Sequence, residues 1–178
     1  AAVNPFLSYG LALALTEDEQ DISPAVAASV NEVLPFTGAI REFVGHQDSV
    51  NAAVLLPDGQ RAISAADDFS VKVWDINTGQ NILTFNQHVS RVIDVVVDEV
   101  SLIAYSAAED GTIYGWDVNT GDLLGEYGYP DDELVSIALS PDASTILASS
   151  GDGWMTLWDL DTEEVIEEYT QFDFPASA

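Results

Sequence analysis

DDFSVKVWDINTG, at residues 67–79, recurs as EDGTIYGWDVNTG at 109–121 and as GDGWMTLWDLDTE at 151–163. The three tryptophans of these stretches, Trp74, Trp116 and Trp158, are each followed by Asp and stand 42 residues apart. A fixed period of about 40 to 45 residues is typical of architectures in which each repeat forms one small sheet. The chain is therefore an array of similar units.

Each unit is predicted to be a four-stranded antiparallel sheet. The first repeat contains four short runs rich in β-forming residues, at 49–55, 61–65, 70–75 and 80–85. Turn sequences separate these runs: Pro-Asp-Gly at 57–59 suits a type I turn, and Gly79 and Gly121 stand where φ is expected to be positive. The third repeat has Glu163 at that place, so we expect a strained or different turn there.

These residues resemble the WD-repeat (WD40-type) family of β-propellers, over roughly residues 36–169. The resemblance rests on the Trp-Asp pairs, on Gly45-His46 placed 28 residues before Trp74, and on an Asp six residues before every Trp. It implies an all-β fold, a partial propeller of three blades at about 44–86, 87–127 and 128–169 within a domain of residues 36–178. In the family, a His, a Ser or Thr, the Asp and the Trp form a hydrogen-bonded tetrad inside each blade. The implied members are His46, Ser64, Asp68 and Trp74; His88, Ser106, Asp110 and Trp116; and Asp152 with Trp158.

The third tetrad departs from the pattern, whereas the first two look complete. Pro130 stands at the His position and Ala148 at the Ser position. An unpaired buried polar group costs about 1 to 3 kcal/mol, so we expect a looser third blade, or one that recruits Ser149 or water. The tetrads also account for both histidines of the chain. Without a further His or any Cys, neither a Ser-His-Asp nor a Cys-His arrangement can be assembled, and we expect no catalytic residues.

The number of strands raises the question of closure. The run at 37–43 resembles the outer strand of a preceding blade, so the chain carries three blades and one surplus strand. Closed propellers usually have 4 to 8 blades. Either the chain is a piece of a longer propeller, or another chain completes its sheets. We favour truncation or a hetero-assembly over a six-bladed homodimer, because the run at 37–43 would compete with 163–169 for one sheet edge.

Residues 1–35 differ in kind from the repeats. Pro5 before the apolar run at 6–15 and Pro24 before the run at 25–34 suit the first position of a helix, which predicts a short helical hairpin. It either packs on the first blade or serves as a docking element or the end of an upstream domain. The run at 6–15 is too short to span a bilayer, so no transmembrane segment is expected in this chain.

Acidic residues dominate the composition. The formal charge is 4 − 31 = −27, and no Lys or Arg follows Arg91. This charge argues against nucleic acid and against anionic membrane surfaces, and it permits a basic partner or a divalent cation. No acidic run has the spacing of a calcium loop, so no metal site and no cofactor are expected. Because the chain begins Ala1-Ala2 and is acidic, we expect an extracellular or periplasmic location rather than a cytoplasmic one.

The function implied by the resemblance is that of a non-catalytic platform, a scaffold or complex subunit that binds other proteins. We expect the platform to dock on another chain or to complete a larger propeller. The alternative is an exported acidic module that binds cations or glycans, with carboxylate-dependent hydrolysis as an extension. The candidate partner-binding face comprises loop residues near the tetrads: Gln47, Asp48, Asp67, Phe69, Ser90, Glu109, Tyr129, Asp131 and Trp154. Trp154, at the place of Ser70 and Thr112, either anchors a partner or fills the space left by the incomplete tetrad.

Overall fold

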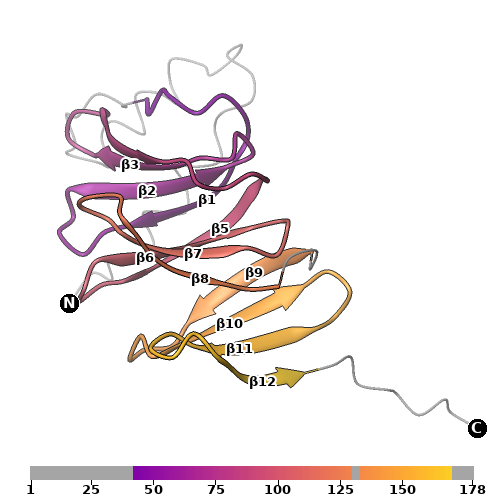
Figure 1. Ribbon diagram of the computed structural model, residues 1–178. Coiled ribbons are helices and arrows are strands. Elements are labelled where there is room, and N and C mark those ends of the chain that lie inside the picture. Colours follow the sequence, from indigo (N-terminus) through magenta and orange to yellow (C-terminus); the bar gives the residue numbers. More distant parts are fainter. Residues whose placement is uncertain (1–41, 130–132, 170–178) are drawn as a thin grey trace, which may run out of the picture. The chain divides into compact units, whose positions relative to one another are not determined.

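The computed structural model describes residues 42–129 and 133–169. These residues form three four-stranded antiparallel sheets, which confirms the predicted all-β class and sheet type (Figure 1). The predicted helical hairpin at 1–35 and residues 37–41 of the predicted surplus strand lie outside the described residues. Glu42 and Phe43, the last residues of that predicted strand, are described and are not in a strand.

Each sheet follows the chain order from one edge to the other. In the first repeat the strands lie within one residue of their predicted bounds. The first sheet contains β1 (Val50–Leu55), β2 (Arg61–Ala66), β3 (Val71–Asp75) and β4 (Asn81–Phe85). The second contains β5 (Val92–Asp98), β6 (Ile103–Ala108), β7 (Ile113–Asp117) and β8 (Leu123–Tyr127). The third contains β9 (Leu134–Leu139), β10 (Thr145–Ser150), β11 (Met155–Asp159) and β12 (Val165–Tyr169).

The turn after each Trp-Asp pair requires a left-handed backbone conformation. Gly79 and Gly121 have φ of 72° and 78°, as predicted. Glu163, at the equivalent place in the third repeat, has φ of 59°. Residues with a Cβ rarely adopt this conformation, so the third turn is strained relative to the other two.

The core lies between successive sheets. Side chains alternate along each strand, so the second sheet packs one face on the first sheet and the other face on the third. The first core cluster joins the first and second sheets and includes Ile63, Val71 and Val73 from one side and Val92, Val95 and Trp116 from the other. The second cluster joins the second and third sheets and includes Tyr105, Ala107 and Ile113 on one side and Leu134, Ile137 and Trp158 on the other.

Polar contacts also tie neighbouring sheets together through their first strands. The Asn51 side-chain amide donates to the Val92 carbonyl at 2.9 Å, between β1 and β5. The Asp94 carboxylate on β5 accepts from the Ser136 hydroxyl at 2.8 Å and from the Ile137 amide at 3.0 Å, both on β9. Because these bonds fix the register of one sheet against the next, the loops between strands are held in place.

Candidate functional site

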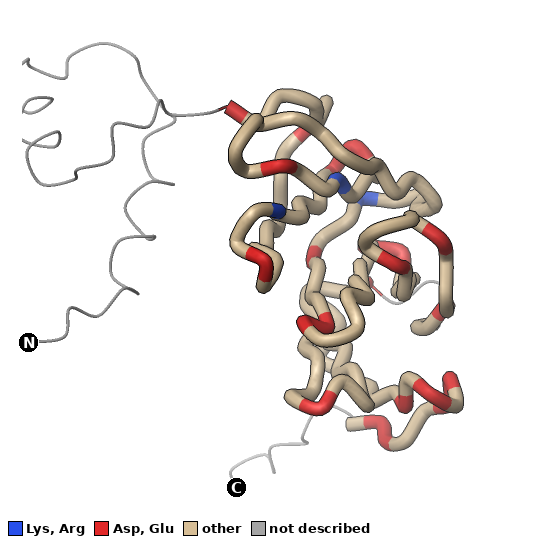
Figure 2. The backbone as a smooth tube through the Cα atoms, turned by 90° about the vertical axis from the view of Figure 1, so that its left-hand side faces the viewer, with Lys and Arg blue, Asp and Glu red and all other residues tan. Residues whose placement is uncertain are grey.

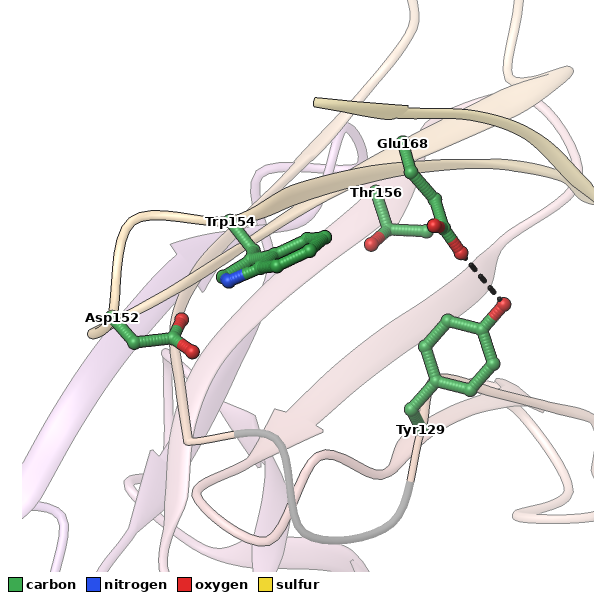
Figure 3. Close-up of a pocket in the computed structure, with 5 residues that line it drawn as sticks. All are labelled: Tyr129, Asp152, Trp154, Thr156 and Glu168. Carbon is green, nitrogen blue, oxygen red and sulfur yellow. Dashed lines mark hydrogen bonds between the residues drawn. The ribbon is translucent and has the colours of Figure 1, made fainter. Parts of the chain in front are cut away.

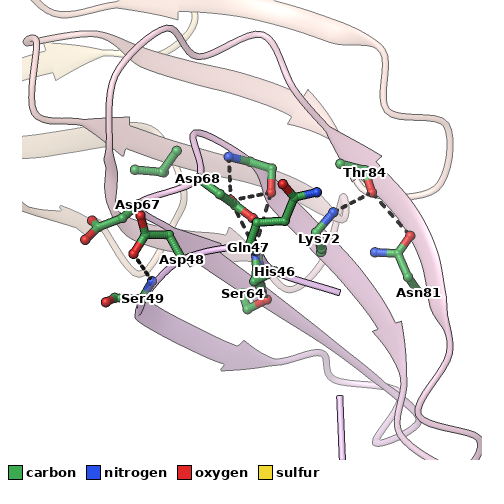
Figure 4. Close-up of polar contacts among 12 residues, drawn as sticks. His46, Gln47, Asp48, Ser49, Ser64, Asp67, Asp68, Lys72, Asn81 and Thr84 are labelled. Atoms are coloured by element: carbon green, nitrogen blue, oxygen red, sulfur yellow. Dashed lines mark hydrogen bonds and ion pairs between the residues drawn. The ribbon is translucent and has the colours of Figure 1, made fainter. Parts of the chain in front are cut away.

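The first tetrad is a closed hydrogen-bond network beside β2 and β3, and Figure 4 shows His46, Ser64 and Asp68 of it. The Trp74 indole N–H donates to Ser64 Oγ at 2.7 Å, and His46 Nε2 lies 2.7 Å from the same oxygen. His46 Nδ1 lies 3.0 Å from Asp68 Oδ2. The four side chains come from the loop before β1, from β2, from the turn after β2 and from β3. The network therefore joins segments up to 28 residues apart in the sequence.

Asp68 is the hub of this network. Besides His46, its carboxylate accepts from the Gln47 amide at 2.9 Å and from the Ser70 hydroxyl at 2.6 Å. Burial works against the ionised form of Asp68. The hydrogen bonds from Ser70, Gln47 and His46 outweigh that effect and hold the pKa of Asp68 well below its ordinary value of 3.8.

The second network is not closed, contrary to the prediction that both would be complete. His88 Nε2 lies 2.8 Å from Ser106 Oγ, which also accepts from the Trp116 indole at 3.2 Å. His88 Nδ1 has no hydrogen-bond partner among the described residues. Asp110 accepts from the Thr112 amide at 3.2 Å instead. Burial of the imidazole lowers the pKa of His88 to about 4, although the charge of Asp110 acts in the opposite direction.

The third repeat leaves its tryptophan unpaired. Trp158 is 7% exposed, and its indole nitrogen has no partner among the described residues. Ser149 does not substitute for the missing serine, because its hydroxyl donates to the Ser136 carbonyl at 3.2 Å. Pro130, at the His position, lies outside the described residues. A buried indole N–H without an acceptor costs the third blade about 1 to 3 kcal/mol.

We expect the substitution Ala148→Ser to raise the free energy of unfolding by about 1 kcal/mol, since Ala148 occupies the place of Ser64 and Ser106. The new hydroxyl would give the buried Trp158 indole an acceptor. Urea denaturation would measure the change. Ala107→Ser is the matched control: Ala107 is fully buried among apolar side chains of the second core cluster, and its substitution should destabilise the protein. Equal losses from both substitutions would contradict this explanation of the third blade.

An aromatic residue 31 positions before each tryptophan forms part of every blade, and it is not among the residues predicted from the sequence. Phe43 contacts Trp74 edge-on with ring centroids 5.8 Å apart, and Phe85 stacks on Trp116 at 4.9 Å. Tyr127 contacts Trp158 edge-on at 6.4 Å. The spacing itself was the available signal, because it repeats as regularly as the Trp-Asp pairs.

The described residues of the predicted partner-binding face lie in the loops before β1, β5 and β9 and in the turns before β3, β7 and β11. The strand pairing places these loops and turns at the same end of the strands. Several of the side chains have partners within the chain: Asp67 accepts from Asn51 at 2.7 Å, and Glu109 pairs with Arg91. Phe69 is 45% exposed. Asp131 lies outside the described residues. That this face binds a partner stays a prediction.

Two residues of that face, Tyr129 and Trp154, meet in one pocket on the third sheet. It has a volume of about 360 Å³ and is also lined by Asp152, Thr156 and Glu168. Figure 3 shows the Trp154 indole between Asp152 on one side and Thr156 and Glu168 on the other. The Tyr129 hydroxyl donates to Glu168 Oε1 at 3.1 Å. The pocket therefore combines two aromatic rings with two carboxylates.

Cations are confined to part of the described chain. Arg61, Lys72 and Arg91 lie in or next to the first and second sheets, and the third sheet has none (Figure 2). Within residues 42–129 and 133–169, no group of three or more His, Cys, Asp or Glu side chains is placed to hold a metal ion. The same residues contain no helix long and apolar enough to cross a membrane.

Comparison with known proteins finds similarity in the repeats. The family model of the WD domain, G-beta repeat, matches residues 38–75 and 121–159. The U3 small nucleolar RNA-associated protein 15 homolog of Xenopus tropicalis is 32% identical over 66 residues, 36% of this chain and 13% of that protein. The human serine-threonine kinase receptor-associated protein is 37% identical over 60 residues, 33% of this chain and 17% of the relative. The chain thus spans less than a fifth of either relative.

Among solved structures, that of U3-55K is similar, with a TM-score of 0.69 at 20% identity, over 75% of this chain and 42% of the other. This likeness supports the fold. The predicted extracellular or periplasmic location is wrong, because a relative named for a small nucleolar RNA belongs to the cell interior.

Proposed function

We propose, from the premise that this chain is a WD-repeat protein, that it is a non-catalytic platform for protein contacts whose two end sheets are covered by further blades. Those blades belong either to the rest of a longer propeller or to a partner chain. The proposal rests on the contrast between the sheet faces inside the array and those at its ends.

The main support for this proposal is the exposure of Val50. This residue is 53% exposed, whereas its equivalents in the next two repeats, Val92 and Leu134, are 0% and 6% exposed. Val92 and Leu134 are buried because each packs against the preceding sheet. The first sheet thus presents the same kind of apolar face as the other two, and the occupant that suits it is another sheet of the same type. Leu55, on the same strand, is 55% exposed.

The third sheet, at the other end of the array, has an exposed apolar residue on the face that would meet a following sheet. Met155 is 38% exposed, whereas its equivalents Val71 and Ile113 are fully buried against the following sheet. Large apolar side chains exposed on a sheet face are typical of interaction surfaces. Each end of the array therefore presents the kind of sheet face that packs against a neighbouring sheet inside the array.

Binding rather than catalysis suits the polar groups of the repeats. Both histidines are bonded to serines that are buried inside the blades and that also accept from a tryptophan indole, so neither serine hydroxyl is presented to a substrate. Protein assembly also agrees with the names of relatives: one, from Arthroderma otae, is a probable subunit of an E3 ubiquitin ligase complex and is 42% identical over 52 residues. Proteins are favoured over nucleic acid as partners, because the formal charge of −27 repels phosphates.

The mass of the chain in solution tests the proposal through the variant Val50→Asp. We expect the wild-type chain to associate into species heavier than the 19.1 kDa monomer, because its end faces cover each other when no further blade is present. A carboxylate in that face should restore the monomer. Light scattering after gel filtration, at about 0.15 M salt so that charge repulsion is screened, would measure both masses.

Ile82→Asp is the matched control. Ile82 is exposed to the same 53% as Val50, but its equivalents Leu124 and Ile166 are exposed as well, at 53% and 52%. This substitution should therefore leave association unchanged. A well-folded wild-type monomer, or equal effects of the two substitutions, would contradict the proposal.

A further inference from the structure

We propose that the pocket on the third sheet binds the ammonium group of a lysine side chain from a partner protein. This inference names the chemistry of one contact and rests on the proposed function of the chain as a platform. The pocket is lined by Tyr129, Asp152, Trp154, Thr156 and Glu168 (Figure 3).

A comparison with the first sheet shows what the pocket lacks. Thr156 stands at the place of Lys72, and Glu168 at the place of Thr84. In the first sheet, the Lys72 side chain crosses from β3 to β4 and its ammonium donates to Thr84 Oγ1 at 3.3 Å. The first sheet thus holds its own ammonium group at the position where the third sheet has a pocket.

The second sheet fills the same position in another way. Tyr114 stands there, and its ring packs on His88 with centroids 4.8 Å apart. Thr156 is too short to replace either Lys72 or Tyr114, and it is 9% exposed beneath the larger side chains. The third sheet is therefore the one in which a side chain from outside has room to enter.

The lining matches a cation. Trp154 and Tyr129 are 43% and 40% exposed, so their rings are accessible to a ligand, and aromatic rings attract cations through their electron-rich faces. Asp152 and Glu168 add two carboxylates. No Lys or Arg follows Arg91 in the sequence, so residues 92–178 provide no ammonium or guanidinium group to balance them.

Lysine is favoured over arginine because the equivalent position of the first sheet is occupied by a lysine. A linear alkyl stem also suits passage between Trp154 and Tyr129, where it would bury its methylenes while the ammonium reaches Glu168. The partner segment would be basic, which agrees with the large negative charge of this chain.

Titration with Nα-acetyl-lysine amide tests the site, followed by the tryptophan indole N–H signals in NMR spectra, with the Trp154 signal assigned from Trp154→Phe. We expect saturable shifts at Trp154. Replacing Trp154 by Thr, the residue of the second repeat, should weaken binding about three-fold, and Glu168→Gln should do so by a similar factor, as typical of exposed cation–π and ion pairs. Trp154→Phe keeps an aromatic ring and should retain most of the affinity. In both Trp154 variants the indole signal of Trp158, whose ring lies 5.3 Å from that of Tyr129, reports binding in place of the lost signal.

Two controls separate a specific site from general attraction to an acidic protein. Glu126→Gln removes the same charge at the equivalent position of the second sheet. Because Tyr114 fills the place of the pocket there, this substitution should leave binding unchanged. Nα-acetyl-norleucine amide has a similar stem without the charge and should not bind. Equal weakening by Glu126→Gln and Glu168→Gln, tighter binding of Nα-acetyl-arginine amide, or no saturable shift would overturn the proposal. None of these results bears on the end faces, whose test is the mass of the Val50 variant.

Discussion

Asp68→Ala is expected to lower the free energy of unfolding by about 3 kcal/mol or more. The reason is the number of donors that depend on one carboxylate: His46, the Gln47 amide, and both the amide and the hydroxyl of Ser70. Hydrogen bonds to a charged group contribute about 1.5 to 3 kcal/mol each, and buried donors left without an acceptor add a desolvation cost. Chemical denaturation followed by tryptophan fluorescence would measure the loss.

Asp110→Ala is the matched control in the second repeat. Asp110 occupies the equivalent position, yet it accepts from the Thr112 amide, at 3.2 Å, and not from His88. We expect a loss of about 1 kcal/mol. If the two alanine variants were equally destabilised, the closed first network and the open second network would not differ in solution as they do in the structure.

The second large effect concerns His88 and pH. We expect the wild-type protein to lose about 2 kcal/mol of stability between pH 7 and pH 5, relative to His88→Asn. The unfolded chain binds a proton on His88 below its ordinary pKa of 6.5, whereas the folded protein does so only below about 4. Below pH 6.5 protonation therefore favours the unfolded state, by about 1.4 kcal/mol for each pH unit. Stability from this group is complete above pH 6.5 and declines as the pH falls.

The asparagine variant is the reference because carboxylate repulsion also changes with pH and is common to both proteins. Asp68 does not interfere in this window. Its pKa is lowered on folding, so its contribution is complete above its ordinary value of 3.8 and is lost only as the pH falls below that value. Parallel stability profiles for the two proteins between pH 5 and 7 would show that His88 is not buried in its neutral form.

Much of the fold could be predicted because it depends on local chemistry repeated three times. The Trp-Asp spacing, the β-forming runs and Gly79 each specify a strand or a turn within one repeat. The tetrad residues were implied by the resemblance to the WD-repeat family. These features are readable from sequence because the residues concerned recur at fixed intervals.

Features that depend on distances between side chains could not be predicted. The sequence places His88 and Asp110 in register with His46 and Asp68, yet only the first pair is hydrogen-bonded. The pocket depends on the short Thr156 near Trp154, whereas the sequence alone predicts Trp154 as an anchor or a space filler. Tyr129 stands at the place of Gly45 and its ring lies against Trp158, with centroids 5.3 Å apart.

The central proposal is that further blades cover the two end faces of this array. The mass of the wild-type chain in solution, beside Val50→Asp and Ile82→Asp, tests it most directly. We expect species above 19.1 kDa for the wild type and for Ile82→Asp, and a monomer for Val50→Asp. A folded wild-type monomer at 19.1 kDa would contradict the claim.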